Sequence, residues 1–184
     1  MEKRKYERGL SREKPLFLLL KTLNGGNFMR KKRCCFTGHR PEKMEYSEED
    51  IRPRLKKAIE WAIGKGIVTF ITGMAMGTDI WAAEIVLEIK DKNPDIHLVC
   101  ALPHPDFEKY RSDEEKIRFN TIIKKADYVK LVNERYFTGC YQVRNEWMVN
   151  RSKMVIAVFD GKPSGTGNTV RYAKNTGVEV INLI

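Results

Sequence analysis

The run Thr72-Gly73-Met74-Ala75-Met76-Gly77-Thr78-Asp79 sets the pattern for the rest of this chain. An apolar, β-branched run at residues 67–71 precedes it and predicts a buried strand. Apolar residues then recur at helical spacing over residues 80–90 and predict a helix. The order strand, glycine turn, helix leaves the unpaired N–H groups of the helix start beside the turn, where an anion such as a phosphate is stabilised. The two glycines either admit a ligand close to the main chain or simply shape the turn.

Strand and helix patterns alternate over residues 33–184. The apolar runs predict strands at residues 33–37, 67–71, 96–102, 128–132, 154–159 and 178–183, and the 3.6-residue patterns predict helices at residues 80–90, 112–126, 141–151 and 168–175. The strands are continuously apolar, which is typical of a parallel sheet covered on both faces. We therefore expect an α/β fold of Rossmann type, a doubly wound, mostly parallel sheet with helices on both faces. Such sheets bind ligands at the carboxyl ends of their strands, at the point where strand order switches.

A further helix is marked by Ile51 and Leu55, and its start is ambiguous. Ser47 and Asp50 have the spacing of a capping box, which would begin the helix at residue 48. That start would enclose Pro53, and a proline inside a helix costs about 3 kcal/mol. We therefore expect the helix to begin near Pro53.

The chain of 184 residues carries a net charge of +10, but that charge is unevenly distributed. Residues 1–33 contain eleven Lys or Arg and three Glu, whereas residues 34–184 contain twenty-three Lys or Arg and twenty-one acids. We interpret residues 1–29 as a basic extension, disordered or weakly helical, and residues 30–184 as one domain. The near-neutral body argues against nucleic acid as its partner, because phosphate contacts need clustered cations.

Other features narrow the class of protein. The longest apolar run of the extension, residues 15–20, is far too short to span a membrane. The four cysteines have no metal-ligand spacing and suggest buried thiols in a reducing compartment such as the cytoplasm. We predict no cofactor, no metal site and no catalytic triad. A homo-oligomer is left open.

The candidate site residues fall in three turns at strand carboxyl ends and on one short helix. They are Gly38, His39 and Arg40 after the first strand; Gly73, Ala75, Gly77, Asp79 and Glu84 around the glycine turn; Arg144 and Asn145 on the short helix; and Gly165, Thr166, Asn168 and Thr169 after the fifth strand. Glycines and helix starts can hold a phosphate, and guanidinium groups can supply the counter-charge. Each group also has a structural alternative. These are a capping histidine and a surface arginine after the first strand, a complement to the helix dipole for Asp79, a surface salt bridge for Arg144 and Asn145, and a plain flexible loop after the fifth strand.

Four ordered motifs carry a resemblance to a known family. They are residues 37–41, residues 73–84, residues 144–149 and residues 165–173, and together they resemble the YpsA-like (YoqJ-like) branch of the SLOG superfamily. The resemblance implies a Rossmann-like fold related to the DNA-processing protein DprA and to the LOG enzymes. It also implies binding of a nucleotide or a nucleotide-derived molecule similar to ADP-ribose. Ser164 departs from the pattern, because many relatives have a glycine there.

Two other functions remain open on the same resemblance, and whether the chain is an enzyme is left undecided. One is N-glycosidic hydrolysis similar to that of LOG proteins, and the other is DprA-like binding of single-stranded DNA. LOG enzymes have a glutamate three residues after the Gly-Thr of the last loop, whereas this chain has Thr169 there. A hydroxyl cannot carry the negative charge that steadies an oxocarbenium-like centre. We therefore expect little LOG-type turnover and name no catalytic residue.

Overall fold

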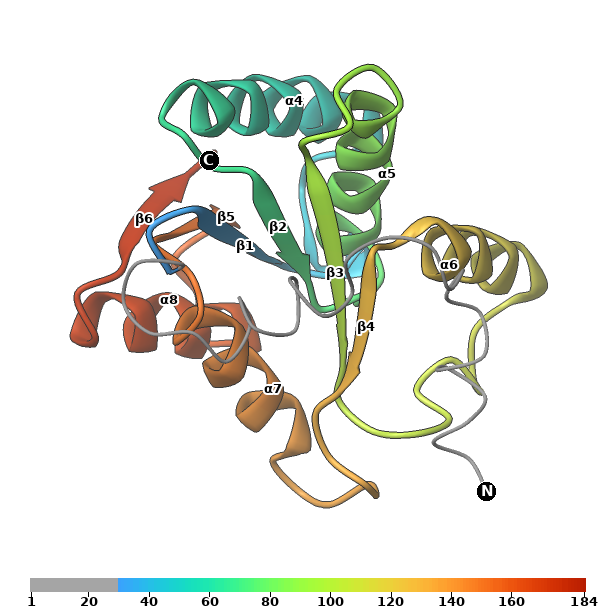
Figure 1. Ribbon diagram of the computed structural model, residues 1–184. Coiled ribbons are helices and arrows are strands. Elements are labelled where there is room, and N and C mark those ends of the chain that lie inside the picture. The colour runs from blue at the N-terminus through green and yellow to red at the C-terminus, as the bar shows by residue number, and fades with distance from the viewer. Residues whose placement is uncertain (1–29) are drawn as a thin grey trace.

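The computed structural model describes residues 30–184, and the expectations for residues 1–29 lie outside this range. The described residues form a six-stranded, all-parallel sheet of order β4-β3-β2-β1-β5-β6 (Figure 1). The strands are β1 (Arg33–Gly38), β2 (Thr69–Thr72), β3 (His97–Leu102), β4 (Tyr128–Leu131), β5 (Met154–Val158) and β6 (Glu179–Asn182). The prediction of a Rossmann-like parallel sheet is confirmed.

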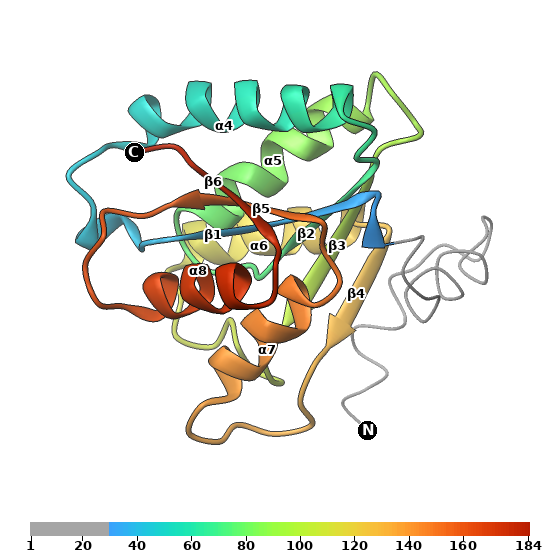
Figure 2. The same ribbon diagram turned by 90° about the vertical axis from the view of Figure 1, so that its left-hand side faces the viewer.

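Helices cover both faces of this sheet. One face carries α4 (Glu48–Gly64), α5 (Thr78–Lys90) and α6 (Asp113–Lys125), and the other carries α7 (Cys140–Val149) and α8 (Gly165–Asn175). Figure 2 shows α4 and α5 on one side of the sheet and α7 and α8 on the other. A short 3-10 helix, η1 (Pro41–Lys43), follows β1 and was not expected. No helix among residues 30–184 is both long and apolar enough to cross a membrane.

The core consists of two apolar layers separated by the sheet. Neighbouring residues of β1 divide between them: Cys34 and Phe36 pack toward α4 and α5, and Cys35 packs toward α7 and α8. This division follows from the two-residue period of a strand. Burial on both faces explains why apolar residues of the central strands occur at consecutive positions rather than only at alternate ones.

The strand order switches direction between β1 and β5. From β1 the chain adds β2, β3 and β4 outward on one side, and then returns to place β5 against the other side of β1, with Gly38 paired to Val158. The loops that follow β1 and β5 therefore diverge from the same edge of the sheet. In open α/β sheets that divergence leaves a crevice for a ligand.

The start of α4 differs from our expectation. The helix begins at Glu48, with a complete capping box between Ser47 and Asp50, and Pro53 lies inside it as the sixth residue. Two effects offset the hydrogen bond that Pro53 cannot donate. The capping box satisfies N–H groups at the helix start, and the added turn buries Ile51 completely.

The start of α8 also lies earlier than predicted, at Gly165 rather than residue 168. Ser164 is its N-cap and accepts a hydrogen bond of 3.0 Å from the backbone N–H of Gly167. A serine cap compensates for the weak helical propensity of the glycine-rich first turn. As a result, the loop and the helix start meet at the carboxyl edge of the sheet.

Candidate functional site

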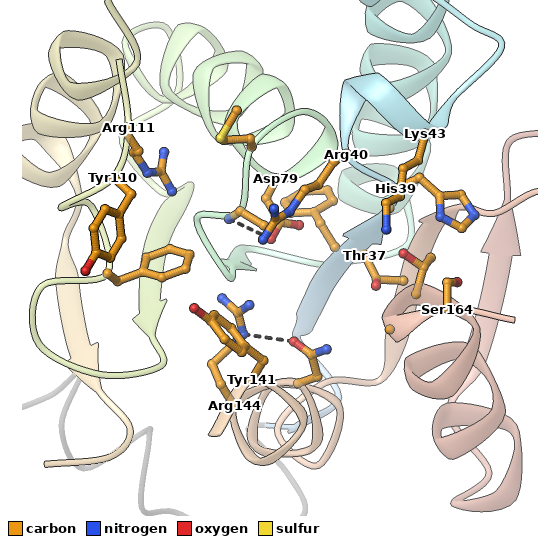
Figure 3. Close-up of a pocket in the computed structure, with 18 residues that line it drawn as sticks. Thr37, His39, Arg40, Lys43, Asp79, Tyr110, Arg111, Tyr141, Arg144 and Ser164 are labelled. Atoms are coloured by element: carbon orange, nitrogen blue, oxygen red, sulfur yellow. Dashed lines mark hydrogen bonds between the residues drawn. The ribbon is translucent and has the colours of Figure 1, made fainter. Parts of the chain in front are cut away.

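A pocket of about 570 Å³ opens at the carboxyl ends of β1 and β2 and at the start of α8 (Figure 3). It therefore lies at the switch point of strand order, where the fold favours ligand binding. The loop that follows β3 and the first turns of α7 complete its wall. The lining residues are Phe36, Thr37, Gly38, His39, Arg40, Lys43, Ala75, Met76, Asp79, Phe107, Tyr110, Arg111, Tyr141, Arg144, Asn145, Ser164, Gly165 and Thr166.

The turn after β1 supplies one fixed and one free basic group. The buried ring of His39 lies against the neighbouring loop, with Nε2 2.8 Å from Oδ1 of Asp160. Arg40 is exposed, and no described residue forms an ion pair or hydrogen bond with its guanidinium. Arg40 is therefore available to a ligand, whereas His39 joins the loops after β1 and β5.

Charged side chains from other elements hold the glycine turn between β2 and α5. Arg144 on α7 donates from Nη1 to the carbonyl oxygens of Gly73 and Ala101. Arg111, in the loop after β3, donates to the carbonyl oxygen of Met74, a non-glycine residue with φ of +59°. These contacts stabilise a backbone conformation that residues other than glycine rarely adopt.

Asp79 completes this turn from within α5. Its Oδ2 accepts a hydrogen bond of 3.1 Å from the backbone N–H of Ala75. Its Oδ1 is buried and has no hydrogen-bond partner among the described residues. Burial raises the pKa of Asp79, and the nearby charges of Arg144 and Arg111 only partly oppose that effect.

Burial also shifts the pKa values of the two arginines of the pocket wall, Arg144 and Arg111. Burial lowers the pKa of Arg144, which is 4% exposed, against the opposing effect of Asp79. Burial likewise lowers the pKa of Arg111. Both guanidinium groups stay protonated at neutral pH, since an arginine loses its proton only far above it. The wall therefore holds positive charge in a poorly solvated place.

The start of α8 offers unpaired donors. The backbone N–H groups of Gly165 and Thr166 form no hydrogen bond among the described residues, and the first turn contains no acidic side chain. At the start of α5, by contrast, the carboxylate of Asp79 already accepts from the turn. Of these two helix starts, α8 is thus the better place for an external anion.

The structure brings most of the expected site residues together. Those lining the pocket are Gly38, His39, Arg40, Ala75, Asp79, Arg144, Asn145, Gly165 and Thr166. Whether they contact a ligand stays a prediction.

The other five expected residues lie outside the pocket wall. Gly73 packs against Arg144, and Gly77 has φ of +82° and packs against Pro41. Thr169 accepts a hydrogen bond of 2.9 Å from Asn145, and Asn168 is exposed on α8.

Glu84 lies on the side of α5 that faces away from the pocket. It accepts from Arg118, through both carboxylate oxygens, and from Arg52 at 2.7 Å. Glu48 joins the same two arginines, so the cluster links α4, α5 and α6. The position of Glu84 is thus explained by the packing of three helices.

Several lining residues were missed from the sequence, chief among them Lys43, Phe107, Tyr110, Arg111 and Tyr141. Arg111 and the two aromatic residues before it follow β3, and no candidate site residue was expected in this carboxyl-end loop. Tyr141 lies three residues before Arg144, which puts both on one helix face. That spacing in the sequence could have identified Tyr141 as a neighbour of Arg144 in the site.

Positive charge is concentrated in the pocket. Among the described residues that line it, Arg40, Lys43, Arg111 and Arg144 are cations, and Asp79 is the one carboxylate. The near-neutral balance of residues 34–184 conceals this concentration, because it averages over the whole surface. The field inside a concave site depends on the local groups.

A family model described as the YspA SLOG family (YpsA) matches residues 34–179. This chain belongs to that family. The SPbeta prophage-derived protein YoqJ of Bacillus subtilis is 33% identical over 139 residues, covering 68% of this chain and 81% of YoqJ. A UPF0398 protein of Halalkalibacterium halodurans is 28% identical over 127 residues, covering 65% of this chain and 67% of that protein.

Two solved structures share the fold. DNA processing protein A (DprA) of Streptococcus pneumoniae matches 89% of this chain with a TM-score of 0.62 and 17% identity, and this chain spans about half of that protein, 52%. DprA of Helicobacter pylori, described as binding single-stranded DNA, matches 88% of this chain with a TM-score of 0.56 and 19% identity, over 67% of its own length. These likenesses show the fold alone, a Rossmann-like arrangement.

The expectation about partners was wrong. We argued against nucleic acid from the near-neutral charge of the body, yet a protein with this fold is described as binding single-stranded DNA. The physical reason is that net charge is a property of the whole surface. Strand binding needs only a local cationic site, and the pocket cations provide one.

Proposed function

We propose that this chain of the YpsA SLOG family binds a nucleotide in the switch-point pocket. The observation that carries the proposal is the start of α8. Within residues 30–184, two backbone N–H groups there have no hydrogen-bond partner, and the pocket they face is lined by four cations and one carboxylate. A helix start of this kind binds phosphate through its N–H groups and its dipole. The surrounding cations add the counter-charge that a phosphate needs.

The pocket wall contains groups suited to the phosphate and to the base of a nucleotide. In our proposal the phosphate lies against the N–H groups of Gly165 and Thr166, with Arg40 as the mobile counter-charge. The base packs against the aromatic side chains at the other side of the pocket, Phe107 and Tyr141. The volume of about 570 Å³ falls in the range of small-molecule sites.

Thermal unfolding tests this proposal directly. The protein is melted with adenosine monophosphate, with deoxyadenosine monophosphate, and with adenosine, which has the same base and ribose but no phosphate. A ligand at a hundred times its dissociation constant adds about 2.7 kcal/mol to the unfolding free energy. We expect the two monophosphates to raise the melting temperature and adenosine to have little effect. Equal shifts with adenosine and adenosine monophosphate would contradict a phosphate site at α8.

Binding of single-stranded DNA is the second candidate function. It is favoured by the architecture shared with H. pylori DprA and by the cations of the pocket. A titration with a single-stranded oligonucleotide at several salt concentrations tests it, because phosphate contacts make the affinity fall as salt rises. If the protein binds mononucleotides but not the oligonucleotide, single-stranded DNA binding is ruled out as its function.

Hydrolysis of an N-glycosidic bond is not part of the proposal. The hydroxyl of Thr169, where LOG enzymes have a glutamate, donates to the carbonyl oxygen of Gly165 and accepts from Asn145. Glu84 is bound by two arginines outside the pocket. A positioned acid or base typically contributes a hundred- to ten-thousand-fold in rate, on the order of 3–5 kcal/mol. We therefore expect binding without robust release of free base.

A further inference from the structure

Aromatic side chains are unusually exposed beside the pocket. Tyr110 is 92% exposed, Tyr136 is 62% exposed, and Phe137 and Tyr141 are each about two-fifths exposed. They come from the loop after β3, the loop after β4 and the first turn of α7. We call these four residues the aromatic shelf. Large exposed apolar groups that gather in one place mark an interaction site.

The shelf is continuous with the pocket. Tyr110 and Tyr141 line the pocket, and Figure 3 shows Tyr110 on the opposite side of it from Ser164. Tyr136 does not line the pocket, and its ring centroid is 6.5 Å from that of Tyr141. Tyr136 therefore lies one ring beyond the pocket mouth. A ligand that fills the pocket and extends outward past Tyr141 next meets Tyr136.

A buried histidine, His104, contacts two rings of the shelf, those of Tyr136 and Tyr141. The ring of His104 lies 5.3 Å from Tyr136 and 5.8 Å from Tyr141, nearly perpendicular to both, at 82° and 79°. Nε2 of His104 also lies 3.4 Å from the hydroxyl oxygen of Tyr141. Edge-to-face contacts of this kind fix a ring while leaving its other side open. The exposed side of Tyr136 is thus presented to the solvent in a set orientation.

A flat, exposed aromatic ring can stack on another planar group, such as a nucleobase. Nucleobases stack on such rings whatever their sequence, and exposed cations beside them can contact the connecting phosphates. Lys109 lies over the ring of Tyr110 at 5.6 Å, and Arg135 is an exposed neighbour of Tyr136. A single-stranded nucleic acid combines both features with a nucleotide end that matches the pocket.

We propose that Tyr136 stacks on the second base of a single-stranded oligonucleotide whose first nucleotide occupies the pocket. This inference rests on the proposed nucleotide site and adds a second subsite to it. It predicts that the protein prefers an oligonucleotide to the corresponding mononucleotide. Stacking of one base on an aromatic side chain is worth an affinity gain of about 5- to 150-fold.

Calorimetric titration of the full chain at one salt concentration tests the inference. The two ligands are deoxyadenosine monophosphate and the pentamer of deoxyadenylate with a 5′-phosphate. We expect the pentamer to bind wild type at least about fivefold more tightly. Tyr136→Ala should remove that gain and leave the mononucleotide affinity unchanged, whereas Tyr136→Phe should keep it. Trp61→Ala, at an aromatic residue 44% exposed on α4, is the matched control and should change neither affinity.

The outcomes separate the second subsite from the pocket itself. If wild type binds both ligands equally, or if Tyr136→Ala keeps the full gain, the second subsite is wrong and the nucleotide site stands. If neither ligand binds, both proposals are wrong. Melting curves of Tyr136→Ala and Tyr136→Phe show whether loss of the His104 contact destabilises the fold, since only the phenyl ring preserves that contact. If the surface around Tyr136 binds a protein instead, the pentamer should bind with no higher affinity than the mononucleotide.

Discussion

Arg144 donates from its guanidinium to the carbonyl oxygen of Gly73, which ties α7 to the turn between β2 and α5 across the sheet edge. A second nitrogen, Nε, donates to the side-chain oxygen of Asn145 at 2.8 Å. The contact explains why residue 73 is a glycine. A β-carbon there would lie 2.6 Å from Cζ of Arg144 and 2.8 Å from Oδ2 of Asp79. The glycine thus makes room for the side chains of Arg144 and Asp79 in the pocket wall.

Gly73→Ala is therefore expected to destabilise the protein and to weaken ligand binding. The new methyl group must displace a buried guanidinium that is held by two carbonyl oxygens. Forcing a group into a packed interior typically costs about 1–3 kcal/mol. Urea denaturation measures the loss. Gly64→Ala is the matched control, because a β-carbon there meets nothing within 4 Å. A Gly73→Ala protein as stable as Gly64→Ala would contradict this packing.

Asp79 should make stability depend on pH in an unusual direction. Burial raises its pKa in the folded protein above the value of 3.8 for an unperturbed aspartate. Between the unfolded and folded pKa values the folded state binds more protons, so the contribution of Asp79 falls as pH rises. That contribution is fully present below about pH 3.8 and is lost once the pH exceeds the folded pKa.

Asp79→Asn isolates this effect, because the amide oxygen can still accept from Ala75. Unfolding free energies of both proteins are measured by urea denaturation from acidic to neutral pH. The value for wild type minus the value for the variant is expected to decrease as pH rises. Other carboxylates, such as Asp127 with its lowered pKa, contribute equally to both proteins and cancel. A difference that grows with pH would mean that Asp79 is stabilised as an anion.

Glu84 should be needed for stability and not for binding. Hydrogen bonds that Arg118 donates to Glu84 and Glu48 raise the pKa of Arg118, although all of these side chains are partly exposed. Because solvent weakens such pairs, Glu84→Gln is expected to cost only about 1 kcal/mol. Nucleotide affinity should not change. Glu88→Gln is the control, since Glu88 is 60% exposed, contacts only Arg52 among the described residues, and should cost less. A large loss of nucleotide affinity in Glu84→Gln would place this carboxylate in the site.

The fold could be predicted because the spacing of apolar residues along the sequence reflects which side chains are buried. The continuous apolar strands predicted a parallel sheet covered on both faces, and the sheet is of that kind. The start of α4 could not be predicted from local propensity. There, the capping box and the burial of Ile51 outweigh the cost of Pro53, and burial depends on the tertiary fold.

The site was harder to predict than the fold. Turns at strand ends identified Arg40 and Gly165, because their position follows from the topology. Arg111 was missed, because it reaches the carbonyl oxygen of Met74 from a loop 37 residues away. The aromatic shelf was missed for a similar reason. Its members lie in three separate segments, and the contacts of His104 with Tyr136 and Tyr141 could not be inferred from the sequence.

The central claim is that a phosphate binds at the start of α8, and a pair of variants at Gly165 tests it most directly. A β-carbon at Gly165 would meet nothing within 4 Å and residue 165 is exposed, so the fold should tolerate both Gly165→Asn and Gly165→Asp. The two side chains have nearly the same shape. The aspartate places a fixed negative charge where the phosphate should lie, while favouring the helix itself.

The measurement is calorimetric titration of both variants with adenosine monophosphate. The account predicts that Gly165→Asp binds at least about tenfold more weakly than Gly165→Asn, a difference of about 1.4 kcal/mol. Equal affinities of the two variants would contradict it.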